Sequence, residues 1–231
     1  MCGRTTLTKS SADIARWLNG DVPAWEPRFN LCPGQDLLVV RRDPQGATEA
    51  VRMRWGLIPA WATDPAIANQ CINARAETID SKPAFRETFL RGQRCLIVVD
   101  GWYEWTTLPS RRRQPFAIRM PDRSLFAFAG LWDTWRAPSS GEVVTTCTIV
   151  TTVTNRQTAH LHHRMPVVLS PADHAKWLDP RTRPADLRSL LTPYRGGLDV
   201  FAVSMTLNTG TVDEPHCLDP VTDEAEPSLW R

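Results

Sequence analysis

Short apolar runs bounded by proline, glycine or aspartate recur along the chain. Runs of this length, rich in β-branched and aromatic residues, are typical of β-strands. They predict strands at 36–40, 95–99, 115–120, 125–132, 146–153 and 166–169. The Pro/Ser/Gly-rich stretch at 137–142 predicts a loop between two strands and not a domain boundary.

Helix signals are fewer. Capped or amphipathic segments predict helices at 11–20, 83–91, 171–179 and 184–191. The second has Pro83 at its start and Gly92 after its end, the residue types that open and close helices. Many strands with a few helices that do not alternate with them predict an α+β fold. We expect a single domain around a largely antiparallel, barrel-like β-sheet with a few peripheral helices.

Composition narrows the class of protein. The chain has 231 residues, 42% hydrophobic and 23% charged, which is ordinary for a globular domain and argues against disorder. No apolar run approaches the roughly 20 residues that cross a bilayer, and the N-terminus lacks the apolar core of a secretory signal. We therefore expect no membrane partner and a cytoplasmic location. There the six cysteines, none in a C-x-x-C pair, are free thiols.

Charge is distributed unevenly along the chain. Residues 213–231 carry six acidic side chains against one arginine and are predicted to form an acidic C-terminal tail. Residues 1–212, the predicted domain, carry 26 basic and 19 acidic residues. Of the 27 basic residues 24 are arginines, whose guanidinium groups bind phosphate bidentately, although a GC-rich genome gives the same bias. A basic body permits an anionic partner without requiring one.

Cys2 stands where two reactive groups can meet on one residue. Cysteine is small, so methionine aminopeptidase is expected to remove Met1 and expose the α-amine of Cys2 beside its thiol. Their reference pKa values, about 7.7–8.0 and about 8.5, leave both groups partly deprotonated near neutrality. Such an aminothiol attacks an amide as an N-terminal nucleophile, or condenses with an aldehyde to form a thiazolidine. The alternative is a cysteine that occupies the second position by chance.

Glu104 lies between Trp102 and Trp105, directly after an apolar strand. A carboxyl group held against indole rings is poorly solvated, so its pKa rises and it can act as a general acid near neutrality. The alternative is a glutamate paired with one of the many arginines. Ten tryptophans are unusual; most belong to the core, but exposed ones beside arginines can stack on unpaired bases. The three arginines at 111–113 favour a solvated hairpin loop over a phosphate clamp.

Two further stretches carry polar candidates. Strand alternation would place Asn73, Arg75 and Glu77 on one face as a polar binding strip, or as an ordinary exposed strand face. His160 and His162 would likewise share a strand face. A metal site needs a third ligand, and no cysteine or carboxylate lies nearby, so a general acid or base role for one histidine is favoured over a metal.

Several motifs occur together in a fixed order along the chain. They are MCGR, RFNLCPG, WGLIPAW, NARAET, RCLIVVDGWYEW, QPFAI, LFAFAGLW and HHRMPVVL. In this combination the chain resembles the SOS-response-associated peptidase (SRAP) family over nearly its whole length. The string VSMTLN, at 203–208, is similar to the last strand of that family.

The resemblance implies an α+β domain with a groove for DNA. It implies a monomer that binds single-stranded DNA or single/double-strand junctions and crosslinks to abasic sites without a cofactor or a metal. In the cell it would associate with the nucleoid when bound to DNA. The aldehyde of the ring-opened sugar would react with Cys2 to form a thiazolidine. By motif, Asn73 would hold the sugar, and Glu104 would be the acid and base for imine formation and ring closure. His162 would assist ring opening and proton transfer, including reversal.

The same resemblance implies the DNA contacts. Residues that would contact phosphate or line the site are Arg4, Asn30, Arg75 and Arg164, and those that would border the bases are Trp61 and Trp105. The chain departs from the family where CLIVVD lacks a common proline, and after VSMTLN, where it reads TGTVDEPHCLDP. The second departure leaves the role of Asn208 open.

Two other functions are compatible with these residues. An N-terminal-nucleophile cysteine peptidase or amidase would use Cys2 on proteins or peptides, as the family name implies. A non-catalytic nucleic-acid module would use arginines and tryptophans alone. A heat-stable complex with an abasic oligonucleotide distinguishes the crosslinking function from both.

Overall fold

Thirteen strands make up most of the regular structure in residues 2–221, the part of the chain that this computed structural model describes. The strands are β1 (Thr5–Leu7), β2 (Arg28–Leu31), β3 (Asp36–Arg42), β4 (Thr48–Trp55), β5 (Asn73–Arg75), β6 (Arg94–Val99), β7 (Gly101–Thr107), β8 (Arg113–Arg119), β9 (Phe126–Arg136), β10 (Val143–Val153), β11 (Arg164–Pro166), β12 (Val168–Leu169) and β13 (Asp199–Ala202). The α-helices are α1 (Ser11–Leu18), α2 (Pro83–Leu90), α3 (Pro171–Leu178) and α4 (Pro184–Leu187). The 3₁₀ turns are η1 (Pro65–Gln70), η2 (Ala76–Thr78), η3 (Arg188–Leu190), η4 (Met205–Thr209) and η5 (Pro215–Leu218).

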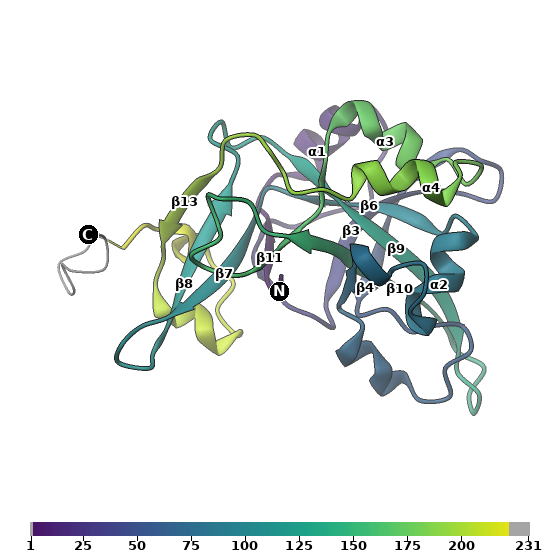
Figure 1. Cartoon of the computed structure of the whole chain (residues 1–231), viewed down its shortest axis with the longest axis horizontal. Coiled ribbons are helices and arrows are strands. Elements are labelled where there is room, and N and C mark those ends of the chain that lie inside the picture. The colour runs from purple at the N-terminus through teal and green to yellow at the C-terminus, as the bar shows by residue number, and fades with distance from the viewer. Residues whose placement is uncertain (1, 222–231) are drawn as a thin grey trace.

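The strands form two sheets that share one hydrophobic core (Figure 1). The smaller sheet has the order β13-β8-β7-β1-β2, and the larger runs β11-β10-β4-β3-β6-β9-β12, with β5 beside β10. Within the described residues the pairing is antiparallel apart from β10, which runs parallel to β4 and to β5. Asp100 is the single residue between β6 and β7, so the chain passes directly from one sheet into the other. The predicted α+β, barrel-like, largely antiparallel architecture is confirmed.

β6 lies between β3 and β9 in the larger sheet, and all six of its residues are buried. An uninterrupted apolar run is typical of a strand covered on both faces. Helices α2 and α3 pack over β9 and β6. Arg94, 1% exposed, donates to the carbonyls of Phe89, Trp177 and Asp179 at 3.1, 2.7 and 2.5 Å. It helps to close the C-terminal ends of both helices, where carbonyls lack partners within the helix.

The predicted strands and helices are confirmed with small changes of length. The stretch at 166–169 divides between β11 and β12, and the predicted helix at 184–191 divides into α4 and η3. The loop at 137–142 joins β9 to β10, and the arginines at 111–113 lie in the β7–β8 hairpin, both as predicted. None of the helices in the described residues is long and apolar enough to cross a bilayer.

Two local predictions were wrong. The expected strand at 203–208 is the 3₁₀ turn η4, because the Ser204 hydroxyl accepts from the amide of Thr206 at 3.3 Å and starts a turn. Gly210 ends that turn with a φ of 73°. The stretch around His160 and His162 is a turn and not a strand, since the amide of His162 donates to the carbonyl of Thr158 at 3.2 Å.

Regular packing continues past residue 212, where the acidic tail was expected to begin. Asp213 accepts from the amides of Phe29 and Asn30 at 2.6 and 2.7 Å. Cys217 is buried, and Pro220 forms a β-bridge with Val203. The first residues of the expected tail therefore pack on the domain, and the prediction of a separate tail now concerns residues 222–231, which lie outside the described residues.

Candidate nucleic-acid site

The N-terminal segment enters the site beside β7. β1 pairs antiparallel with β7, with Thr5 opposite Trp102. Extending this pairing toward the N-terminus brings Cys2 close to Glu104. Burial, and next the negative charge of Glu104, raise the pKa of the Cys2 thiol, which reflects that closeness.

Asp100 holds β1 in this position. Its Oδ1 accepts from the hydroxyl of Thr6 at 2.7 Å, and its Oδ2 accepts from the amide and the hydroxyl of Thr8 at 2.9 and 2.5 Å. The Asp100 side chain is 7% exposed, so water competes little for these bonds. Because two residues separate Cys2 from β1, fixing β1 also fixes Cys2.

Cys2 and Asn73 form the buried part of the site. Both are buried, and the Asn73 Nδ2 donates to the Cys2 carbonyl at 2.7 Å. Burial raises the pKa of the thiol well above its ordinary value, so the thiol is protonated near neutrality and needs a base to become nucleophilic. The Asn73 Oδ1 has no hydrogen-bond partner among residues 2–221. It is thus a buried acceptor for an incoming hydroxyl or amine.

Glu104 supplies a carboxyl group of unusual pKa. It is 3% exposed, and burial raises its pKa from 4.5 to about 7. Alternation along β7 places Trp102 on the same face as Glu104 and Trp105 on the opposite face. A carboxyl group with a pKa near 7 exists in both protonation states at neutral pH, and can therefore donate or accept a proton.

His162 faces the site as a neutral imidazole. Burial lowers its pKa to about 4. Its Nδ1 accepts from the amide of Arg164 at 2.9 Å, so in the neutral ring the proton lies on Nε2. The ring stacks on that of His163 with centroids 4.3 Å apart. Among the described residues no three His, Cys, Asp or Glu side chains group together as metal ligands would.

These groups open onto a groove of about 680 Å³. It is lined by Gly3, Arg4, Glu104, Trp105, Arg112, Arg113, His162, Met205 and Asn208. Cys2 and Asn73 are buried behind this lining. The groove therefore brings Glu104 and His162, far apart in sequence, together beside Gly3, the residue that follows Cys2.

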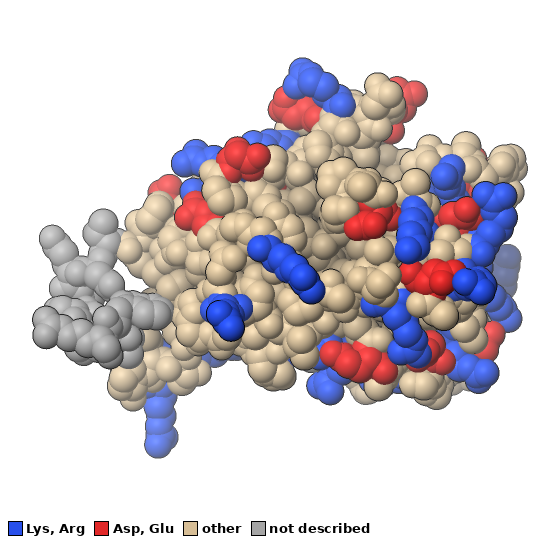
Figure 2. Space-filling model, turned by 45° about the horizontal axis from the view of Figure 1, so that its top comes forward, with Lys and Arg blue, Asp and Glu red and all other residues tan. Residues whose placement is uncertain are grey.

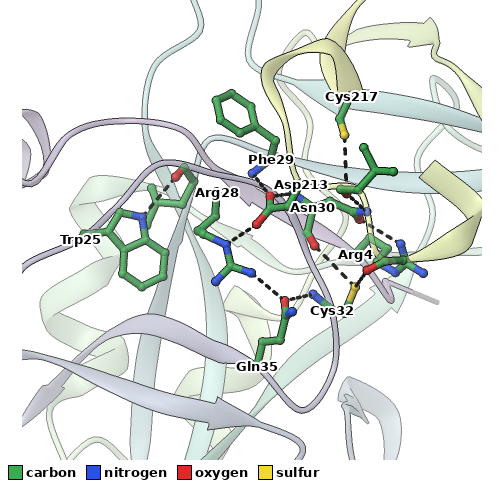
Figure 3. Close-up of polar contacts among 12 residues, drawn as sticks. Arg4, Trp25, Arg28, Phe29, Asn30, Cys32, Gln35, Asp213 and Cys217 are labelled. Carbon is green, nitrogen blue, oxygen red and sulfur yellow. Dashed lines mark hydrogen bonds and ion pairs between the residues drawn. The ribbon is translucent and has the colours of Figure 1, made fainter. Parts of the chain in front are cut away.

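Arg4 is fixed in the groove wall by Asn30 and the η4 turn (Figure 3). Its Nη1 donates to Asn30 Oδ1 at 2.9 Å and to the carbonyl of Leu207 at 3.0 Å. Asn30 is 1% exposed, and its Nδ2 donates to the carbonyl of Val212 at 2.7 Å. The structure thus places Asn30 behind Arg4, with its side chain fully engaged by the protein.

Trp105 forms the adjoining part of the wall. Its Nε1 donates to Asn208 Oδ1 at 2.6 Å, and Asn208 Nδ2 donates to the carbonyl of Arg113 at 2.9 Å. The guanidinium carbons of Arg4 and Arg113 lie 5.8 and 5.4 Å from the ring centroid of Trp105. Asn208, whose role the sequence left open, connects the η4 turn to the indole and to the β7–β8 hairpin.

Arg164 is engaged by other protein groups and does not line the groove. It is 7% exposed and forms two bonds to the carboxylate of Glu77, at 2.7 and 2.9 Å, and one to the carbonyl of Thr151, at 2.6 Å. Glu77 was expected to extend a strand face with Asn73, but it lies in η2 and its pKa is lowered chiefly by its bonds to Arg164. Arg164 therefore anchors η2 to β10.

Trp61 and Arg75 lie outside the groove lining. Trp61 is 56% exposed, and Arg75, the last residue of β5, is also exposed. Both are accessible to a ligand that extends beyond the groove. Sequence analysis missed Met205 as a groove residue and took Arg112 and Arg113 for solvated loop residues. Only their placement next to Glu104 and Asn208 in the fold shows that they line the groove.

Known proteins match this chain over nearly its whole length. The model of the family described as SOS response associated peptidase (SRAP) matches residues 1–210. The chain belongs to the SRAP family. Among its relatives are the abasic site processing proteins YoqW and YoaM of Bacillus subtilis (strain 168). Each is 39% identical over 95% of this chain, and over 99% and 98% of its own length respectively. The abasic site processing protein HMCES of Xenopus tropicalis is 28% identical over 99% of this chain and 82% of its own.

Solved structures share the SRAP fold. A protein from Bacteroides thetaiotaomicron superposes with a TM-score of 0.87 at 25% identity, covering 96% of this chain and all of its own. A protein from Bordetella bronchiseptica superposes with a TM-score of 0.76 at 26% identity, covering 88% of this chain and all of its own. The arrangement of the two sheets is thus that of the SRAP family.

Proposed function

We propose that this protein recognises abasic sites in single-stranded DNA and joins itself to them covalently through Cys2, once Met1 has been removed. The observation that carries the proposal is the cluster in which Cys2 bonds to Asn73 and lies beside Glu104, at a groove that His162 also lines. The names of the relatives support the same substrate.

The reaction joins an aldehyde to an aminothiol. The ring-opened abasic sugar carries the aldehyde, and the α-amine of Cys2 adds to its carbon; loss of water gives an imine. The thiol then loses its proton, the sulfur adds to the imine carbon, the nitrogen takes up one proton, and a five-membered thiazolidine closes. One water leaves, and the balance needs no oxidant, reductant or cofactor.

Glu104 moves the protons in this scheme, and His162 assists by donating a hydrogen bond. With a pKa of about 7, Glu104 donates to the departing hydroxyl and, as carboxylate, accepts the proton of the thiol, whose pKa burial has raised. His162, neutral with its proton on Nε2, donates a hydrogen bond to the ring oxygen of the sugar and stabilises the negative charge that develops there as the ring opens. Asn73 accepts a hydrogen bond from a sugar hydroxyl at its Oδ1, which has no partner among residues 2–221.

The strand is held by the accessible arginines and tryptophans. Arg4 and Arg75 bind phosphates, and Trp61 and Trp105 stack on bases. Asn30 and Arg164 act indirectly, by positioning Arg4 and anchoring η2. The proposal needs groups of one chain only and is made for a monomer. It acts in the cytoplasm, at the nucleoid, on single strands or at single/double-strand junctions.

Denaturing gel electrophoresis tests the proposal. Protein shown by mass spectrometry to begin at Cys2 is incubated with a single-stranded oligonucleotide that carries one abasic site. We expect a shifted band that survives heating, with the mass of protein plus oligonucleotide less one water. Cys2→Ala should remove this band, because the sulfur is absent. Cys2→Ser should leave at most a labile imine that borohydride traps.

Cys32→Ala is the matched control, since Cys32 is the one cysteine in the described residues that is not fully buried. It should crosslink as the wild type does. A full-strength heat-stable adduct in Cys2→Ala would contradict the proposal. Hydrolysis of peptides by a wild-type protein that forms no crosslink would instead favour a peptidase.

A further inference from the structure

The β7–β8 hairpin carries two arginines that none of the roles above explains. Arg112 and Arg113 are exposed and line the groove. Neither forms an ion pair with an acidic side chain in the described part of the chain, whereas the nearly buried Arg164 is paired with Glu77. Burial dominates and raises the pKa of Glu104, but the charge of Arg113 lowers it, so these two groups are near each other without forming an ion pair. Two exposed guanidinium groups at the edge of the groove that form no ion pair with another described residue favour an anionic ligand.

The hairpin presents these arginines in a defined shape. Its turn places Arg111 in the left-handed region, with a φ of 62°. The amide of Leu108 donates to the carbonyl of Arg112 at 2.9 Å, and Asn208 Nδ2 donates to that of Arg113 at 2.9 Å. A backbone held in this way loses less conformational freedom when a ligand binds.

The hairpin lies on one side of Cys2. The segment that carries Cys2 continues the pairing of β1 with β7, and the Cys2 carbonyl accepts from Asn73 in β5. β5, which ends at Arg75, pairs with β10 and so belongs to the other sheet. A strand whose abasic site reaches Cys2 therefore has one flank toward the hairpin and the other toward Arg75.

We propose that Arg112 and Arg113 bind the phosphodiester backbone of the abasic strand on one flank of the abasic site only. This inference rests on the proposed function. Arginine forms bidentate, charge-assisted bonds with phosphate, and two adjacent arginines match successive phosphates. The ring of Trp105, 5.4 Å from the guanidinium carbon of Arg113, offers a stacking face for the first base of that flank.

Binding measurements with a tetrahydrofuran abasic analogue test this inference. The analogue has no aldehyde, so it binds without crosslinking. Three single-stranded oligonucleotides extend from the analogue on both sides, on the 5′ side only, or on the 3′ side only. For the double variant Arg112→Ala/Arg113→Ala we expect Kd to rise tenfold or more for the oligonucleotide that extends on both sides. We expect the same rise for only one of the two oligonucleotides that extend on a single side. The slope of log Kd against the logarithm of the salt concentration should fall by about 1.4, which is about 0.7 for each of the two lost phosphate contacts.

Arg111→Ala is the matched control, because Arg111 is an exposed arginine of the same hairpin that does not line the groove. Its Kd should stay within twofold of wild type on all three oligonucleotides. Equal losses on both one-sided oligonucleotides would show general attraction and overturn the inference, as would wild-type binding by the double variant. The wild-type crosslinking assay tests the proposed function separately, so either conclusion can fail alone.

Discussion

At the scale of single residues, Glu104 combines burial with reactivity. The carboxyl group is 3% exposed, and burial raises its pKa to about 7, which suits proton transfer at neutral pH. The same burial disfavours the charged form that must exist above that pH. The free energy of unfolding is therefore lower at any pH at which Glu104 is ionised. A loss of stability of this kind is typical of functional sites.

Replacing Glu104 should separate the two effects. The folded pKa of about 7 lies above the ordinary 4.5, so its contribution to stability is complete below pH 4.5 and lost as pH rises through 7. We expect Glu104→Gln to leave stability unchanged below pH 4.5. Above pH 7 it should raise the free energy of unfolding, on the order of 3 kcal/mol. Urea unfolding across this range measures it; a difference that does not depend on pH would contradict the assignment.

The pH dependence of crosslinking should follow the same carboxyl group. We expect single-turnover rates of the wild type to change with an apparent pKa near 7, and Glu104→Gln to lose that dependence and slow by about 10²–10⁴-fold. His162→Ala should keep the dependence, because His162 with a pKa of about 4 is neutral throughout that range. It should instead alter the rate at which a preformed crosslink reverses. Unchanged formation and reversal in His162→Ala would reduce this histidine to a structural role.

At the scale of elements, β1 is the piece that delivers Cys2. This strand has only three residues, which are too few to hold it in place without further contacts. Asp100, at the corner between β6 and β7, supplies that help through its bonds to Thr6 and Thr8. The corner that joins the two sheets thus also positions the N-terminal residue.

Asp100→Asn should loosen this arrangement. The amide keeps one acceptor oxygen but turns an NH₂ group toward donors of Thr6 or Thr8, so at least one buried bond is lost, at about 1–3 kcal/mol. We expect a lower Tm and slower crosslinking at saturating DNA, with unchanged affinity for the tetrahydrofuran oligonucleotide. Asp122→Asn, on an exposed loop, is the control. A lower Tm with a wild-type crosslinking rate would assign Asp100 to stability alone.

Local sequence predicts elements whose causes are local. The run at β6 and the Pro83 start of α2 are such cases, and both are confirmed. The last strand was misplaced because the hydroxyl of Ser204 competes for a backbone amide and produces η4. Asn30 shows what local sequence cannot predict. Its partners Arg4 and Val212 are 26 and 182 residues away, so no local sequence pattern indicates that it positions Arg4.

At the scale of the whole molecule, charge is dispersed on the face that Figure 2 draws. Figure 2 shows basic side chains standing singly or beside acidic ones on the face drawn, without a continuous basic surface. The excess of basic over acidic residues in the chain up to residue 212 therefore does not form one patch there. Affinity for DNA should then depend on a few arginines near the groove and show a modest dependence on salt.

The proposed function predicts a preference for single strands over duplexes. An abasic nucleotide inside a duplex must leave the stack to reach the groove, which costs a few kcal/mol. We expect crosslinking to a single strand or to a single/double-strand junction to be at least tenfold faster than to the same site within a duplex. Rates at matched salt, with protein in excess, measure the ratio. Equal crosslinking rates on single-stranded and duplex DNA would contradict this prediction and show that the site recognises only the abasic sugar.

The short connection between Cys2 and β1 limits how far the reactive sulfur can reach. Two residues, Gly3 and Arg4, form this tether, and extended residues span at most about 3.3–3.6 Å each. The side chain of Arg4 is itself bonded to Asn30 and to the carbonyl of Leu207, which shortens the reach further. Cys2 therefore moves little, and the abasic sugar must enter the site to reach it. A fusion partner placed ahead of Cys2 would block the amine and occupy the same narrow entrance, so tags for purification belong elsewhere on the chain.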